Sequence, residues 1–76
     1  MKKNELLKIL RLKGVPSISY SLEGLKQGEC LCLLKKSEKW SVVYNSRGKI
    51  INISDFNIEE DAYDFIYNEM KKQYKW

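Results

Sequence analysis

Apolar residues near the start of the chain recur every three or four positions, a spacing that places side chains on one face of an α-helix. This pattern predicts a helix from Lys2 to Lys13, which Asn4 could cap. Gly14 and Pro16 end the helix, because glycine suits the position after a helix and proline cannot continue one. The apolar positions are Leu6, Leu7, Ile9, Leu10 and Leu12.

Two later segments have the composition of β-strands. Residues 17–22 alternate serine with Ile18, Tyr20 and Leu22, which is typical of a half-buried strand. Residues 30–36, CLCLLKK, are apolar on both faces, and such a strand at the edge of a sheet would invite aggregation. The second segment is therefore expected to be a central strand, joined to the first by a turn-like stretch at 23–29.

A second pair of strands is predicted around a polar turn, NSRG at 45–48. Residues 40–44 place Trp40, Val42 and Tyr44 on one face. Residues 49–54 return with Ile51 and Ile53 on one face, and with Ile50 and Asn52 on the other.

The last segment carries the strongest helix signals. Asn57 and Glu60 resemble a capping box, and the charges suit the helix dipole, with acids in the first turns and lysines in the last. The acids are Glu59, Glu60, Asp61 and Asp64, and the lysines are Lys71, Lys72 and Lys75. The face expected to pack on the sheet comprises Ala62, Phe65, Ile66, Met70 and Gln73, widened by Tyr63, Tyr67 and Tyr74.

These elements predict an α+β fold for residues 1–76, with the order helix, four strands, helix. The links between strands are short, which favours a four-stranded antiparallel meander. Each helix must bury its apolar stripe against the sheet, so a single two-layer domain is expected. A chain of 76 residues leaves no room for a second domain.

Charge is distributed unevenly along the chain. The net charge is +4, and the basic residues concentrate in the first two thirds of the sequence, whereas the last third is acidic. No apolar run reaches the roughly 20 residues that span a bilayer. The N-terminus has the basic start of a signal peptide, but charged residues interrupt the apolar region that a signal peptide requires. We expect a cytoplasmic protein that does not enter a membrane.

Few residues offer chemistry of their own. The chain has no histidine, and its only cysteines, Cys30 and Cys32, supply at most half of a zinc site. We expect both thiols to be buried in or near the core. No nucleophile or nucleotide-binding motif is present. The sequence therefore predicts neither an enzyme, nor a metal site, nor a cofactor.

A nucleic-acid-binding module is the alternative that the basic residues raise. Lysines and Arg47 cluster at the expected strand ends, and Trp40 and Tyr44 could stack with bases between them. The basic residues are Lys35, Lys36, Lys39, Arg47 and Lys49. No recognisable nucleic-acid motif accompanies this cluster.

Four short motifs occur in an order that resembles one protein family. They are YSLEG at 20–24, ECLCL at 29–33, WSVVYNSRGK at 40–49 and DFNIEEDAYDFI at 55–66. The series is similar to small bacterial immunity proteins that accompany secreted polymorphic toxins, including effectors of contact-dependent growth inhibition. The matching positions are Trp40, Val42, Tyr44, Arg47, Gly48, Phe56 and Ala62; Ser46 departs from the acidic residue of the family pattern.

The resemblance implies a protein that neutralises a cognate toxin by stoichiometric binding. The surface expected to contact the toxin comprises Tyr44 and Arg47 at the hairpin, and Glu59, Glu60, Asp61 and Asp64 on the last helix. Arg47 could instead pair with the acidic start of that helix, and the helix dipole alone could account for its acids. The oligomeric state is left open.

Overall fold

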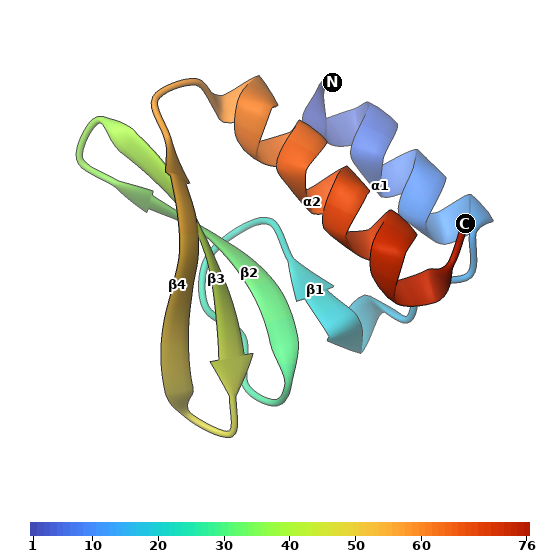
Figure 1. Ribbon diagram of the computed structural model, residues 1–76, viewed down its shortest axis with the longest axis horizontal. Helices are drawn as coiled ribbons and strands as arrows, with labels where there is room; N and C mark the ends of the chain where they lie inside the picture. The colour runs from blue at the N-terminus through green and yellow to red at the C-terminus, as the bar shows by residue number, and fades with distance from the viewer.

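Two helices pack side by side against one face of a four-stranded sheet (Figure 1). The computed structural model describes residues 1–76. Helix α1 spans Lys3–Leu12 and helix α2 spans Glu59–Tyr74. The remaining elements are a short 3₁₀ helix η1 (Ser17–Ser19) and the strands β1 (Tyr20–Ser21), β2 (Cys30–Lys36), β3 (Lys39–Ser46) and β4 (Lys49–Phe56). Neither helix combines the length and the apolar character that crossing a membrane requires.

The strands follow one another across the sheet in chain order, β1-β2-β3-β4. The α+β class and the order helix, four strands, helix are therefore confirmed. The pairs β2–β3 and β3–β4 are antiparallel, but β1 runs parallel to β2, with Tyr20 opposite Leu31. The first pair thus departs from the antiparallel meander that the short links favoured.

The strand predicted at residues 17–22 is reduced to Tyr20–Ser21, because the residues before it form a helical turn. Residues after Pro16 form the 3₁₀ helix, in which the Ser19 N–H donates to the Pro16 carbonyl at 2.9 Å. Ile18 consequently points into solvent, and only two residues pair with β2. The following loop contains Gly24 and Gly28 at positive φ, a conformation that glycine adopts without steric cost, and it returns the chain for a parallel entry into β2.

The main core lies between the helices and the sheet. Helix α2 buries four of its side chains there, α1 adds two, the facing side of β2 and β3 supplies three, and Val15 and Leu22 come from the connecting segments. Its helical members are Leu6, Leu10, Ala62, Tyr63, Ile66 and Met70; its main strand members are Leu31, Leu33 and Val42. The face predicted for the last helix is confirmed at Ala62, Ile66 and Met70, which are buried, and at Phe65, which packs against the core. Tyr63, predicted to widen this face, is also buried, whereas Gln73 is exposed.

A smaller core lies on the opposite face of the sheet. Cys30, Cys32 and Val43 are buried there, with Leu34 packed against them. The loop between β1 and β2 crosses this face (Figure 1), and its Lys26 carbonyl accepts a hydrogen bond from the Cys30 thiol at 3.3 Å. Both faces of β2 are therefore covered, as predicted for a central strand.

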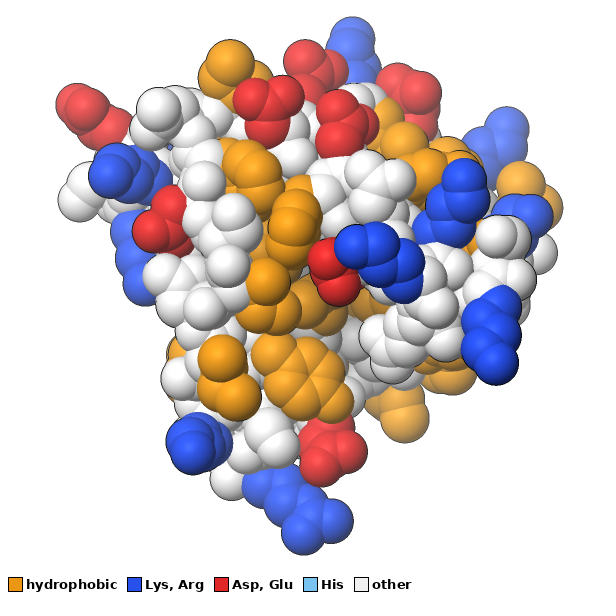
Figure 2. Space-filling view, viewed as in Figure 1, with side chains coloured by type: hydrophobic (Ala, Val, Ile, Leu, Met, Phe, Trp, Pro, Cys, Tyr) orange, Lys and Arg blue, Asp and Glu red, His pale blue; other side chains and the backbone are white.

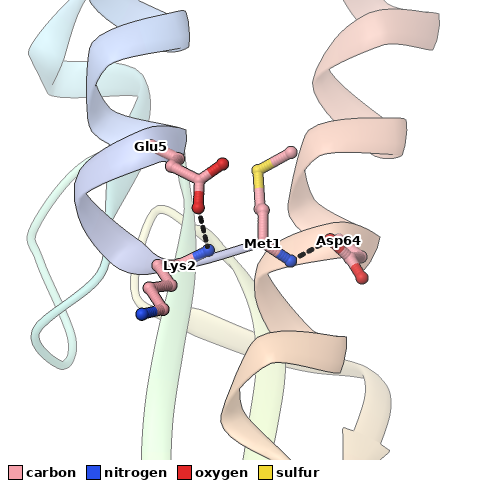
Figure 3. Close-up of polar contacts among 4 residues, drawn as sticks. All are labelled: Met1, Lys2, Glu5 and Asp64. Atoms are coloured by element: carbon pink, nitrogen blue, oxygen red, sulfur yellow. Dashed lines mark hydrogen bonds and ion pairs between the residues drawn. The ribbon is translucent and has the colours of Figure 1, made fainter.

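Neither helix begins at the predicted cap. Helix α1 starts after Lys2, and α2 starts after Ile58, whose carbonyl accepts from the Asp61 N–H at 3.2 Å, so the expected caps Asn4 and Asn57 make no capping hydrogen bond. The two helix starts are instead joined to each other. Figure 3 shows the Met1 ammonium donating to Asp64 Oδ1 at 2.6 Å, a hydrogen bond that raises the pKa of the ammonium above its usual value.

Truncation of Ile66 should destabilise the fold strongly, because its side chain is fully buried between α2 and the sheet. Ile66→Ala is expected to lower the free energy of unfolding by about 2–5 kcal/mol, from lost transfer energy and the cavity that remains. Urea denaturation followed by circular dichroism measures this change. Ile18→Ala is the matched control, since the Ile18 side chain is 71% exposed and its loss should cost under about 0.5 kcal/mol.

Candidate functional site

Strand β4 forms the open edge of the sheet, and it exposes apolar side chains along its length. Ile50, Ile51 and Ile53 are 44%, 47% and 42% exposed. Their alternation is interrupted, because Val42 pairs with Ser54 while its neighbour Val43 pairs with Asn52, so Ile53 is the extra residue of a β-bulge. An edge strand of eight residues with three exposed isoleucines is unusual, since edge strands ordinarily are short or carry charge or proline.

The β3–β4 turn is held by one buried side chain. Arg47 and Gly48 both have positive φ, 52° and 88°, which defines a type I′ turn of two residues. The Asn45 carboxamide oxygen accepts from the Gly48 N–H at 3.0 Å, and its amino group donates to the Lys26 carbonyl at 2.7 Å. Asn45 therefore fastens the turn to the loop that crosses the sheet.

Arg47 occupies a backbone position that suits other residues better. The left-handed conformation favours glycine, asparagine or aspartate at the first turn position, and a longer side chain there is strained. Its side chain is 88% exposed, and its closest ionic contact is a 3.6 Å approach of Nε to Glu29 Oε1. An exposed contact of this length stabilises little. Local stability therefore does not account for an arginine at this position.

The expected pairing of Arg47 with the acidic start of the last helix is wrong. Figure 1 shows the β3–β4 turn at one end of the sheet and the start of α2 at the other end. Strand β4 runs away from the turn along its whole length before the chain enters α2. The carboxylate near Arg47 comes instead from Glu29, just before β2.

Tyr44 joins the turn region to the core. It is half-buried, it packs against the main core, and across the sheet it lies between Leu31 and Ile51. Figure 2 shows apolar side chains continuing from α2 down the uncovered end of the sheet, with charged groups beyond them. We call the exposed part of this hairpin the hairpin surface, and define it as Tyr44, Arg47, Ile50, Ile51 and Ile53.

The four acidic residues predicted as partner contacts lie apart from the hairpin surface, at the start of α2. Asp64 binds the Met1 ammonium. Glu59 lies beside Tyr63, whose phenol pKa is raised first by burial and then by this carboxylate. Glu60 and Asp61 are exposed in the first turn, where negative charge complements the helix dipole. The structure thus places Tyr44 and Arg47 on the same hairpin and separates them from the acids.

The aromatic residues of the basic region are packed rather than free. Trp40 and Tyr44 are partly buried against the main core, and the Lys35 ammonium lies 5.1 Å from the centre of the Trp40 ring. Near them, Lys36 and Lys39 border an open polar groove at the β2–β3 turn. Asp55 also lines this groove, and its pKa is lowered by hydrogen bonds from Ser41 and then Asn52, and by the two lysines.

The cysteines are buried, as the sequence predicted. Cys30 and Cys32 are at most 1% exposed, and their sulfur atoms lie 3.4 Å apart as free thiols. Burial, followed by the contact with the Cys30 thiol, raises the pKa of Cys32 to about 11. A thiol that stays protonated is a poor nucleophile and a poor metal ligand. No three Cys, His, Asp or Glu side chains are placed to hold a metal ion.

The exposure of the β4 isoleucines and the hydrogen bonds of Asn45 were not predicted from the sequence. The run Ile-Ile-Asn-Ile is as apolar as the buried run of β2, so hydrophobicity does not distinguish an edge from a centre. The charges of Lys49 and Asp55 at the two ends of the strand were the available signal, because edge strands tend to carry such residues. The hydrogen bond from Asn45 to Lys26 joins residues 19 positions apart, so no local sequence pattern indicates it.

Replacing Arg47 with asparagine should stabilise the fold. Asparagine adopts the left-handed turn conformation more readily, so the free energy of unfolding is expected to rise by about 0.5–1 kcal/mol. Thermal denaturation of Arg47→Asn measures the change, and Lys49→Asn in the flanking strand is the control without a positive φ. A lower stability for Arg47→Asn would mean that the Glu29 contact outweighs the backbone strain.

The native protein should resist thiol reagents. At pH 8 both cysteines are expected to react with Ellman's reagent many times more slowly than in urea, because they are buried and Cys32 stays protonated. The release of the coloured thiolate measures the rate, and the urea-unfolded chain is the control. Equal rates in the two states would show that the loop does not protect this face.

Comparison of the chain with protein-family models, curated proteins and solved structures found no match.

Proposed function

We propose that this chain is a binding protein that associates stoichiometrically with a partner protein and neutralises it, as an immunity protein neutralises its toxin. The observation that carries the proposal is the exposure of Ile50, Ile51 and Ile53 together on one strand. The resemblance of residues 20–66 to small immunity proteins supports the toxin as the partner, and Tyr44 and Arg47 belong both to that resemblance and to the hairpin surface.

The composition of the hairpin surface suits a protein partner. Protein interfaces are enriched in tyrosine and arginine at their centres, because a tyrosine buries a large area at small entropy cost and an arginine donates several hydrogen bonds. The isoleucines add apolar area that water leaves on binding. The tyrosine, the arginine and the isoleucines all lie on the β3–β4 turn and its two strands.

Inhibition by such a surface needs no chemistry of its own. A bound chain blocks its target by covering the active site or a surface that the target requires, so affinity and electrostatic fit determine the effect. Arg47 and Lys49 lie at the start of β4, and the excess of basic residues in the first two thirds of the chain adds positive charge. The toxin surface that this hairpin fits is therefore acidic.

Co-expression with a secreted toxin tests the proposal, and a toxin gene found directly upstream of this reading frame would supply the candidate. Cells that express the toxin should survive only when this chain is present, and the purified pair should form a one-to-one complex in isothermal titration. Tyr44→Ala with Arg47→Glu should reduce protection, because both changes remove contacts from the hairpin surface. Lys8→Glu on α1 is the control, since it alters an exposed charge far from the hairpin.

Two results would count against the proposal. The first is death of cells that express both proteins at equal levels. The second is micromolar binding to a random oligonucleotide that falls steeply as salt rises, which would favour a nucleic-acid-binding module instead.

A further inference from the structure

We propose that β4 receives an extended segment of the partner as a fifth strand, and that this segment is apolar at its centre and acidic at the end that lies beside Arg47 and Lys49. The inference rests on the proposed binding function and specifies how the partner is held. Three features of β4 carry it: its free backbone groups, the two-sided exposure of its isoleucines, and the positive charge beside the β3–β4 turn.

The backbone of β4 offers hydrogen bonds to an added strand. In a type I′ hairpin the residues that flank the turn, here Ser46 and Lys49, form a hydrogen-bonded pair, and every second residue after them also turns toward β3. Ile50 and Asn52 lie between those positions, so their N–H and C=O groups point away from the sheet. Nothing pairs with them, because β4 is the last strand.

The side chains of β4 favour an added strand over docking on one face. Ile51 lies on the helix side of the sheet, beside Tyr44, whereas Ile50 lies on the opposite side, beside Asn45. A partner resting flat on one face would leave one of these isoleucines in water. A strand added at the edge has side chains on both faces and covers both residues.

The length of the docking segment is limited by the bulge. The register shifts opposite Val42 and Val43, so the regular outer edge ends near Asn52. A bulge of this kind restricts unspecific pairing of an edge strand. We therefore expect a short segment in register with residues 49–52, with its flanking residues reaching past both ends.

Charge identifies the partner segment as acidic at the end beside the turn. Arg47 and Lys49 lie at this end of β4, and Glu29 approaches only the Arg47 Nε, at 3.6 Å. At the other end of β4, Lys36 and Lys39 are accompanied by Glu38 and Asp55, so the charges there are balanced. An Asp or Glu side chain at the turn end of a partner strand therefore meets opposite charge. A second copy of this chain, paired antiparallel over residues 49–52, places Asn52 opposite Lys49 and offers no such acid.

Selection from a phage-displayed library of random peptides tests this inference with the intact chain as bait. The enriched peptides should alternate β-branched or aromatic residues at their centre and carry Asp or Glu beside them. Synthetic copies of the enriched peptides should bind Lys49→Glu about tenfold more weakly than the parent, and bind Lys8→Glu, which changes the net charge equally, with unchanged affinity. Sedimentation of the chain alone should show a monomer.

Ile50→Pro tests the backbone contribution. Proline removes an N–H that points away from β3, so the fold should persist in circular dichroism while peptide binding is lost. If this variant does not fold, the comparison of Lys49→Glu with Lys8→Glu decides alone. The inference is overturned if no peptide is enriched, if the enriched peptides lack acidic residues, if they bind Lys49→Glu as tightly as the parent, or if the chain sediments as a dimer that Lys49→Glu dissociates.

The two tests fail separately. If the chain protects cells from the toxin but enriches no acidic peptide, the binding function is supported and docking at β4 is refuted. If the chain enriches acidic peptides but does not protect cells, docking at β4 is supported and the neutralising function is refuted.

Discussion

Burial of β2 and β3 on both of their faces is the constraint on which the arrangement of the other elements depends. Helices α1 and α2 cover one face through Leu33 and Val42, and the β1–β2 loop covers the other through Cys32 and Val43. The helices and this loop leave β4 uncovered at the edge of the sheet, so its isoleucines remain exposed.

The sequence predicted the elements whose pattern is local. The buried face of α2 followed from a 3.6-residue period, and the position of the β3–β4 turn followed from a short polar segment that contains Gly48. The parallel direction of the β1–β2 pair could not be predicted from a local pattern. Its direction depends on a loop that folds across the sheet, where the Lys26 carbonyl meets groups from two strands, Cys30 and Asn45.

The candidate site was predicted in part, because charge and aromatic content indicate partner contacts without indicating where they meet. Tyr44 and Arg47 lie on the same hairpin because they are neighbours in the sequence. Glu60 and Asp61 belong to the far end of the fold, where the helix dipole and the neighbouring start of α1 account for negative charge. Burial of the isoleucines of β4 could not be judged from their sequence, since it depends on which strand lies at the edge.

The carboxamide of Asn45 has a consequence for the cost of association. It joins the β3–β4 turn to a loop from a distant part of the chain, so the backbone beneath Arg47 and Ile50 is already ordered in the free protein. Flexible loops lose conformational entropy when a partner immobilises them, and that loss subtracts from affinity. At the β3–β4 turn the backbone has already lost most of that entropy during folding. Only the rotamers of exposed side chains remain to be fixed when a partner binds.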